Sequence, residues 1–107
     1  MLPRQNRLAK DKEIKKVLSR GRAFFNPVFN LRFYKNLQAT KFTVVVSTKV
    51  YKQAVKRNRL KRLIRETIRR KLSQLPTGDY VLMCKPLCAK TEESELLKAL
   101  NLLINKV

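Results

Sequence analysis

Apolar and polar side chains alternate most regularly between residues 28 and 34. In an extended chain, successive side chains point to opposite faces. One face would therefore be apolar and the other polar or cationic: Phe29, Leu31 and Phe33 against Asn30, Arg32 and Tyr34. The alternation predicts a strand with one buried face and one face left open to solvent or a partner.

Three further segments have the composition of strands. Residues 42–47 are β-branched and almost wholly apolar, which is expected of a strand buried on both faces. The preceding residues, 36–41, form a plausible hairpin loop between this strand and 28–34. Shorter apolar runs at 23–25 and 79–84 complete the predicted sheet.

A long amphipathic helix is predicted at 54–75. With about 100° of rotation per residue, one arc of this helix is apolar apart from a threonine, and the opposite arc is polar and mostly cationic. The first arc holds Leu60, Leu63, Ile64, Thr67, Ile68, Leu72 and Leu75, and the second holds Asn58, Lys61, Arg62, Arg65 and Arg69. Such a helix packs its apolar side on a core and presents a row of cations outward.

Two shorter helices flank the predicted sheet. The first follows a basic arm at about 1–10; Asp11 is its expected cap, and Gly21 is placed to end it. The second follows Thr91 as its expected cap, with acidic residues in its first turn and leucines recurring at helical spacing. The order is therefore α-β-β-β-α-β-α in one domain, 1–107. We predict an α/β (α+β) two-layer sandwich in which the strands at 42–47 and 79–84 are parallel.

The charge of the chain is large and unevenly distributed. The 107 residues include 26 Lys or Arg and 7 Asp or Glu, for a formal net charge of +19. Residues 72–107 carry four residues of each sign, so the whole excess lies in 1–71. Because a field of one sign repels itself, this excess indicates a polyanionic partner, either nucleic acid or an anionic membrane surface.

Several kinds of chemistry are excluded or disfavoured. The chain has no His, which excludes Ser-His and Cys-His pairs and imidazole metal ligands. Cys84 and Cys88 cannot complete a four-ligand zinc site, and we interpret them as one strand thiol and one loop thiol. No apolar run is long enough to span a membrane, and the first residues lack the centre of a secretory signal. We therefore expect a cytoplasmic protein whose enzymology would be carboxylate-based or supplied by a partner.

The cations of the long helix favour RNA as the partner. Nine Lys or Arg residues fall within 56–71 with only Glu66 opposing them, which destabilises an isolated helix unless an anion neutralises the charge. A membrane-surface helix would have to leave its apolar side free, whereas a small domain needs that side for its core. The polar strand face with Tyr34 resembles surfaces on which single-stranded RNA stacks, which favours RNA over DNA.

Two stretches resemble a known family. The run VVVSTKVYKQAVKRNRLKRLIRE at 44–66, with its Arg57-Asn58-Arg59 centre, resembles the signature of the bacterial ribonuclease P protein component. The start NRLAKDKEIKKVLSRG at 6–21 is similar to the arm and first helix of that family. The order of elements also agrees, so the resemblance spans essentially the whole chain.

The resemblance implies a fold and a function. The fold is a mixed central sheet with a left-handed β-α-β crossover, ribosomal protein S5 domain 2-like; the usual handedness rule opposes such a crossover. The implied function is that of a small accessory subunit without catalytic groups of its own. It binds ribonuclease P RNA and the single-stranded 5′ leader of precursor tRNA and assists endonucleolytic removal of that leader. In that family the RNA holds the catalytic Mg²⁺, and the free protein is expected to be a monomer. The competing hypothesis is a structural RNA-binding protein, such as a small ribosomal protein.

The resemblance also implies two groups of site residues. The helix group faces the catalytic RNA and includes one residue of the preceding loop: Arg57, Asn58, Arg59, Lys61, Arg62, Arg65, Arg69 and Lys49. The second group lines a cleft for the leader: Ile14, Leu18, Asn30, Arg32 and Tyr34. Ile14 and Leu18 have an equally simple interpretation as core residues.

Overall fold

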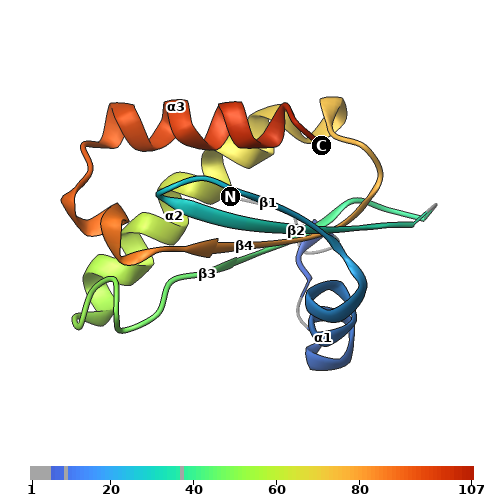
Figure 1. Cartoon of the computed structure of the whole chain (residues 1–107), viewed down its shortest axis with the longest axis horizontal. Helices are drawn as coiled ribbons and strands as arrows, with labels where there is room; N and C mark the ends of the chain where they lie inside the picture. Colours follow the sequence, from blue (N-terminus) through green and yellow to red (C-terminus); the bar gives the residue numbers. More distant parts are fainter. Residues whose placement is uncertain (1–5, 9, 37) are drawn as a thin grey trace.

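A four-stranded sheet forms the centre of the molecule, and helices cover its two faces unequally (Figure 1). The computed structural model describes residues 6–8, 10–36 and 38–107. The predicted order of elements is confirmed. The elements are α1 (Asp11–Arg20), β1 (Arg22–Phe25), β2 (Phe29–Lys35), β3 (Lys41–Val45), α2 (Ala54–Lys71), the 3₁₀ turn η2 (Leu72–Gln74), β4 (Gly78–Cys84), the 3₁₀ turn η3 (Pro86–Lys90) and α3 (Glu93–Ile104).

The strands are arranged in the order β1-β2-β4-β3. β1 pairs with β2 and β2 pairs with β4, both antiparallel, whereas β3 and β4 are parallel. The predicted parallel pair is therefore confirmed, and α2 is the crossover that joins its two strands. The predicted hairpin through 36–41 is wrong, because β4 inserts between β2 and β3. Local sequence cannot reveal this insertion, since β4 lies more than thirty residues further along the chain.

β3 is an edge strand, so the prediction that it is buried on both faces is also wrong. Phe42 and Val44 point into the core, but Val45 on the other face is 41% exposed. The beginning of this edge is covered by the part of the arm that the structure describes. There, Arg7 forms a parallel bridge with Phe42, and the Leu8 amide donates to the Phe42 carbonyl over 2.9 Å. Residues 1–5 and 9 of the predicted arm lie outside the described residues.

The main core lies between the sheet and the two long helices, α2 and α3 (Figure 1). Tyr80 of β4 is completely buried at its centre. Its ring lies 4.7 Å, centroid to centroid, from the rings of both Phe33 and Phe42, and it stacks nearly parallel to the Phe42 ring. The Tyr80 hydroxyl donates to the Pro76 carbonyl over 2.6 Å. This ring therefore joins three neighbouring strands to the turn that ends the α2 region.

A second, smaller core lies beneath the opposite face of the sheet, where α1 packs. Val17 of α1 contacts Leu8 and Val81, all buried. A Cβ atom at Gly21 would collide with the backbone carbonyls of Val17 and Phe33, so only glycine permits this tight exit from α1. α1 lies beneath one end of the sheet only (Figure 1).

Neither predicted helix cap is observed. Lys10 rather than Asp11 occupies the N-cap position of α1, and Asp11 begins the helix itself. Glu92 rather than Thr91 precedes α3, and the Thr91 hydroxyl instead donates to the Leu87 carbonyl over 2.7 Å. Asp11 and Thr91 therefore predicted the starts of the two helices to within about two residues, which is the usual precision of such signals.

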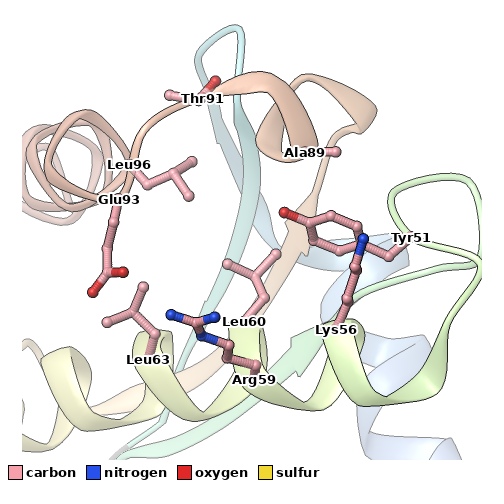
Figure 2. Close-up of a pocket in the computed structure, with 9 residues that line it drawn as sticks. All are labelled: Tyr51, Lys56, Arg59, Leu60, Leu63, Ala89, Thr91, Glu93 and Leu96. Atoms are coloured by element: carbon pink, nitrogen blue, oxygen red, sulfur yellow. The ribbon is translucent and has the colours of Figure 1, made fainter.

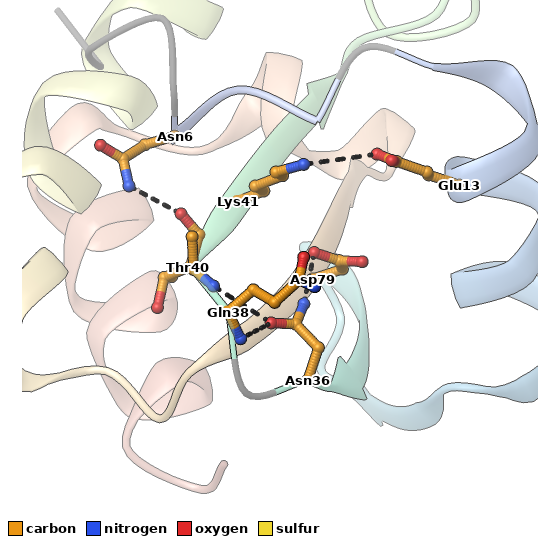
Figure 3. A network of polar contacts seen from close by, with 8 residues as sticks. Asn6, Glu13, Asn36, Gln38, Thr40, Lys41 and Asp79 are labelled. Carbon is orange, nitrogen blue, oxygen red and sulfur yellow. Dashed lines mark hydrogen bonds and ion pairs between the residues drawn. The ribbon is translucent and has the colours of Figure 1, made fainter.

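Polar contacts hold the β2–β3 connection against the rest of the sheet (Figure 3). The Asn36 side-chain oxygen accepts from the Gln38 amide over 3.0 Å, which closes a turn. The Asn36 side-chain nitrogen donates to Asp79 over 2.8 Å. Burial raises the pKa of Asp79. Lys41 extends toward Glu13 of α1, 3.9 Å away, so these contacts link the connection to both β4 and α1.

Replacing Tyr80 tests the central position of its ring. Tyr80→Phe removes only the hydroxyl and should lower the free energy of unfolding by about 1 kcal/mol, whereas Tyr80→Ala should lower it by about 3–5 kcal/mol. Urea denaturation followed by circular dichroism measures both values. Equal losses from the two variants would contradict the ring's packing role.

The same hydroxyl predicts an alkaline dependence of stability. Burial raises the pKa of Tyr80 above its ordinary value. The folded state therefore retains the proton more tightly than the unfolded chain. The stability that the protonated Tyr80 hydroxyl contributes is complete below the unfolded pKa of about 10. This stability is lost as the pH rises through and beyond that value. Urea titrations across this range should show a steeper loss of stability in the wild type than in Tyr80→Phe, and parallel curves would contradict the assignment.

Candidate nucleic-acid interface

The outward side of α2 carries a row of polar and cationic residues. Leu60, Ile64 and Ile68 recur every four residues and are buried against the sheet. The residues on the opposite side of the helix, called the outer row here, are exposed except for the half-buried Arg65: Asn58, Arg62, Arg65 and Arg69. The predicted amphipathic arrangement is thus confirmed. Lys61 lies on the border of the buried side and is half-buried.

Arg57 points away from the outer row and holds the loop before α2. Its Nη1 donates to the carbonyls of Tyr51, over 3.0 Å, and Lys52, over 2.7 Å. The tip of that loop carries the exposed Lys49, whose amide donates to the Ser47 hydroxyl over 3.3 Å. Arg57 therefore positions the loop that presents Lys49, a structural role that the Arg57-Asn58-Arg59 motif did not indicate.

Arg69 is the one member of the outer row with an acidic partner among the described residues. Its Nε donates to Glu66 over 2.9 Å. This hydrogen bond with Arg69 is the main cause that lowers the pKa of Glu66 to about 2. The carboxylate is consequently ionised at neutral pH and offsets the charge of Arg69. The outer row is therefore most positive around Arg62 and Arg65.

Arg59 lies on the flank of α2 that faces α3 rather than in the outer row. It is exposed and lines a cavity together with Lys56 and the first turn of α3. The seven helix residues predicted as one site are thus divided by the structure among the outer row, the loop, the border of the core and this cavity.

A second candidate surface lies on the sheet face that α1 partly covers. Asn30, Arg32 and Tyr34 of β2 all point to this face and are half-buried. The Arg32 Nη1 donates to the Leu18 carbonyl over 3.2 Å, which ties the end of α1 to the sheet. The Lys16 ammonium lies 4.8 Å from the centroid of the Tyr34 ring. The structure therefore brings the three predicted strand residues together beside α1.

The two helix residues predicted for this surface differ from each other. Ile14 is half-buried and packs against the small core of Leu8, Val17 and Val81, which fits its interpretation as a core residue. Leu18 is 36% exposed at the end of α1. Of the pair, Leu18 is the one that remains available to a ligand.

Beyond the end of α1, the sheet presents a line of side chains that is exposed at its two ends and half-buried in the middle. The strand registers align one residue from each of the four strands, in the order Phe25, Asn30, Met83 and Val45. This open row, as it is called below, includes a phenylalanine that is 67% exposed. The sequence analysis missed Phe25, although adjacent phenylalanines at 24 and 25 in a strand require one of them to face away from the main core.

Two buried polar atoms on this face have unused hydrogen-bonding capacity. The Asn30 Oδ1 and the Arg32 Nε are buried and lack a hydrogen-bond partner within the described ranges. A buried polar group without a partner is unfavourable, so such groups commonly mark a place where a ligand or water supplies the missing contact. Here Asn30 provides an acceptor within the open row, and Arg32 provides a donor beside it.

The interpretation of the two cysteines is confirmed. Cys84 ends β4, Cys88 lies in η3, and both are buried and free. The Cys88 thiol donates to the Val28 carbonyl over 3.2 Å. The hydrogen bond with Cys88 and burial both raise the pKa of the Cys84 thiol, which disfavours the reactive thiolate.

In the part of the chain that the structure describes, no helix is long and apolar enough to cross a membrane. The same part contains no cluster of three or more His, Cys, Asp or Glu side chains that could hold a metal ion. The notable surfaces are thus the outer row of α2 and the open row of the sheet. They lie on opposite sides, because α2 packs against one face of the sheet and the open row belongs to the other.

Comparison with known sequences identifies relatives over almost the full length. The family model for ribonuclease P matches residues 2–107. The ribonuclease P protein component of Pseudanabaena sp. is 40% identical over 85 residues, covering 78% of this chain and 73% of that protein. The corresponding protein of Clostridium acetobutylicum is 34% identical over 107 residues, covering 96% of this chain and 89% of that protein.

Solved structures agree with this relationship. The ribonuclease P protein from Thermotoga maritima superposes with a TM-score of 0.84 at 25% identity, covering 94% of this chain and 96% of that chain. The protein from Staphylococcus aureus has the same fold, with a TM-score of 0.88 at 20% identity and coverage of 94% of each chain. By both sequence and fold, the chain belongs to the family of ribonuclease P protein components.

Proposed function

We propose that this chain, as the protein subunit of ribonuclease P, uses the outer row of α2 to bind ribonuclease P RNA. We propose further that its open sheet face holds the single-stranded 5′ leader of precursor tRNA during endonucleolytic leader removal. The observation that supports this assignment is the presence of two RNA-compatible surfaces on opposite faces of one sheet. Such an arrangement allows the chain to contact two strands at once.

The outer row suits an RNA backbone. Guanidinium groups bind phosphates through paired hydrogen bonds, and each neutralised phosphate releases counterions into solution. Arg62 and Arg65 carry no acidic partner among the described residues, so their charge is available to the RNA. The loop that Arg57 holds in place adds Lys49 beside the start of the helix.

The open row suits a short stretch of single-stranded RNA that is bound without strong sequence preference. Neighbouring strands lie about 4.8 Å apart, so a row across four strands spans about 14 Å. Phe25 offers an exposed ring on which a base can stack, and stacking is tolerant of sequence. The Asn30 Oδ1 and Arg32 Nε can exchange hydrogen bonds with the base or backbone.

The chemistry itself is assigned to the RNA partner. Mg²⁺ held mainly by that RNA would supply the metal-activated water for hydrolysis. The described residues do not form an acidic cluster suited to a resident ion, so no step is assigned to a metal site in this chain. The residues of the chain bind and orient RNA, and leader removal of this kind would take place in the cytoplasm.

The competing hypothesis, a structural RNA-binding protein of the ribosome, is not favoured by the family relationship. A reconstitution assay tests the proposed function directly. With a bacterial ribonuclease P RNA and precursor tRNA at low Mg²⁺, the chain should accelerate leader removal, measured by gel separation of the cleaved leader. The Arg62→Ala/Arg65→Ala variant should accelerate it less at equal concentration. Lack of acceleration by the wild type would leave only the structural hypothesis.

The salt dependence of RNA binding tests the outer row. Arg62→Ala should reduce the slope of log affinity against log salt by about 0.7–0.9, the value for one lost phosphate contact. Arg69→Ala should reduce it less, because Glu66 already offsets that charge. Filter binding to ribonuclease P RNA at several salt concentrations gives the slopes. Lys106→Ala, which replaces an exposed lysine distant from the outer row in sequence, is the control. A slope for Arg62→Ala equal to that of the control would exclude Arg62 from the interface.

Phe25 tests the leader surface. Phe25→Ala should weaken binding of precursor tRNA by about 1–3 kcal/mol, the cost of one lost base stack, and should leave binding of mature tRNA unchanged. Affinities are measured with the reconstituted complex. Leu102→Ala removes an exposed apolar side chain of α3, on the other side of the sheet, and serves as the control. An equal loss for precursor and mature tRNA would contradict leader binding at the open row.

A further inference from the structure

A cavity of about 380 Å³ opens where the beginning of α2 meets η3 and the beginning of α3 (Figure 2). It lies on the α2 and α3 side of the sheet and is therefore separate from the open row. Its volume is near the lower end of the range of about 300–1,000 Å³ for ligand pockets, enough for one nucleotide but not for a duplex. The lining residues are Tyr51, Lys56, Arg59, Leu60, Leu63, Ala89, Thr91, Glu93 and Leu96.

The cavity combines apolar surface with an aromatic ring. Leu60, Leu63 and Leu96 supply aliphatic surface from α2 and α3. Tyr51 is half-buried at the side of the cavity, with its hydroxyl directed inward (Figure 2). The Lys56 ammonium lies 5.9 Å from the centroid of the Tyr51 ring. A flat, electron-rich ring beside a cation is suited to an aromatic ligand that carries negative charge.

Two opposite charges complete the lining. Arg59 comes from α2 and Glu93 from the first turn of α3, and Figure 2 shows both side chains at the cavity. Across the described ranges, neither of them forms an ion pair within 4.0 Å. The Glu93 carboxylate can therefore accept hydrogen bonds from a ligand, while the Arg59 guanidinium donates them.

We propose that this cavity accepts one unpaired guanine nucleotide of an RNA strand that lies along α2. The proposal rests on the proposed binding of RNA by the outer row. The base would lie against Tyr51 and the leucines, and Glu93 would accept hydrogen bonds from guanine N1–H and N2–H₂. Arg59 would donate to O6 or N7 of the same base, and Lys56 would neutralise the phosphate.

Guanine fits this set of side chains better than the other bases. Its Watson–Crick edge presents two adjacent donors that match the two oxygens of one carboxylate, and its O6 and N7 accept from arginine. Uracil has a single donor between two carbonyls, which a carboxylate would repel. Adenine and cytosine each offer one amino group but no second donor beside it.

The position of the cavity favours a nucleotide of RNA as its occupant. Arg59 precedes Arg62 by three residues, and residues three apart are neighbours on a helix surface. A strand bound to the outer row therefore passes close to Arg59. An unpaired base can leave that strand and enter the cavity without requiring a second binding partner.

Titration of the isotope-labelled chain with mononucleotides tests the proposal. Guanosine 5′-monophosphate should shift the backbone amide resonances of Tyr51, Leu60 and Glu93 at lower concentration than the adenosine, cytidine or uridine monophosphates. Glu93→Gln should weaken guanosine monophosphate binding by roughly tenfold, because it removes a charged acceptor. Glu95→Gln removes the same charge two residues further along α3, outside the cavity lining, and should have little effect.

A second variant and a separate readout keep the outcomes distinct. Ala89→Leu should obstruct the cavity and abolish the nucleotide-induced shifts without changing the net charge. Arg62→Ala should weaken binding of ribonuclease P RNA but retain the response to guanosine monophosphate, so that failure of the proposed function is recognised separately. Equal responses to all four nucleotides that are unaffected by Glu93→Gln would indicate phosphate binding alone and overturn the proposal. Absence of any shift at the cavity would overturn it as well.

Discussion

The contact between the apolar side of α2 and the sheet is the interaction on which the other features depend. Leu60, Ile64 and Ile68 are buried on it, while the same helix carries nine cations between Lys56 and Lys71. Like charges one turn apart destabilise a helix, and burial of large aliphatic side chains offsets that repulsion. The packing also determines which cations face outward. The outer row is thus a consequence of how the core is filled.

β4 contributes side chains to both faces of the small sheet. Tyr80 and Leu82 of this strand lie in the main core, and Val81 contacts α1 on the opposite face. Because β4 is inserted between β2 and β3, both faces of the sheet remain continuous across four strands. α1 is too short to cover the whole of its face, and the open row lies where this cover is incomplete. In the proposed function, the two faces therefore hold different RNA strands.

The accuracy of the sequence predictions followed the range of the interactions involved. The alternation around Phe29, Leu31 and Phe33 and the helical period of α2 were confirmed, because burial on one side of an element leaves a local pattern. The predicted hairpin at 36–41 was wrong, because strand order depends on contacts with β4, far along the chain. The prediction that the strand at 42–47 is buried on both faces was wrong for the same reason, because a β-branched run is compatible with an edge strand as well as a central one.

By itself, the sequence determined the element order, the two-sided character of β2 and α2, the excess of positive charge in 1–71 and the family resemblance, since each of these is carried by residue type and spacing alone. It did not distinguish the roles of arginines within one helix. Arg57 holds a loop, Arg59 lines a cavity and Arg69 pairs with Glu66. These differences depend on which neighbours the folded chain brings to each guanidinium, so only the tertiary structure decided them.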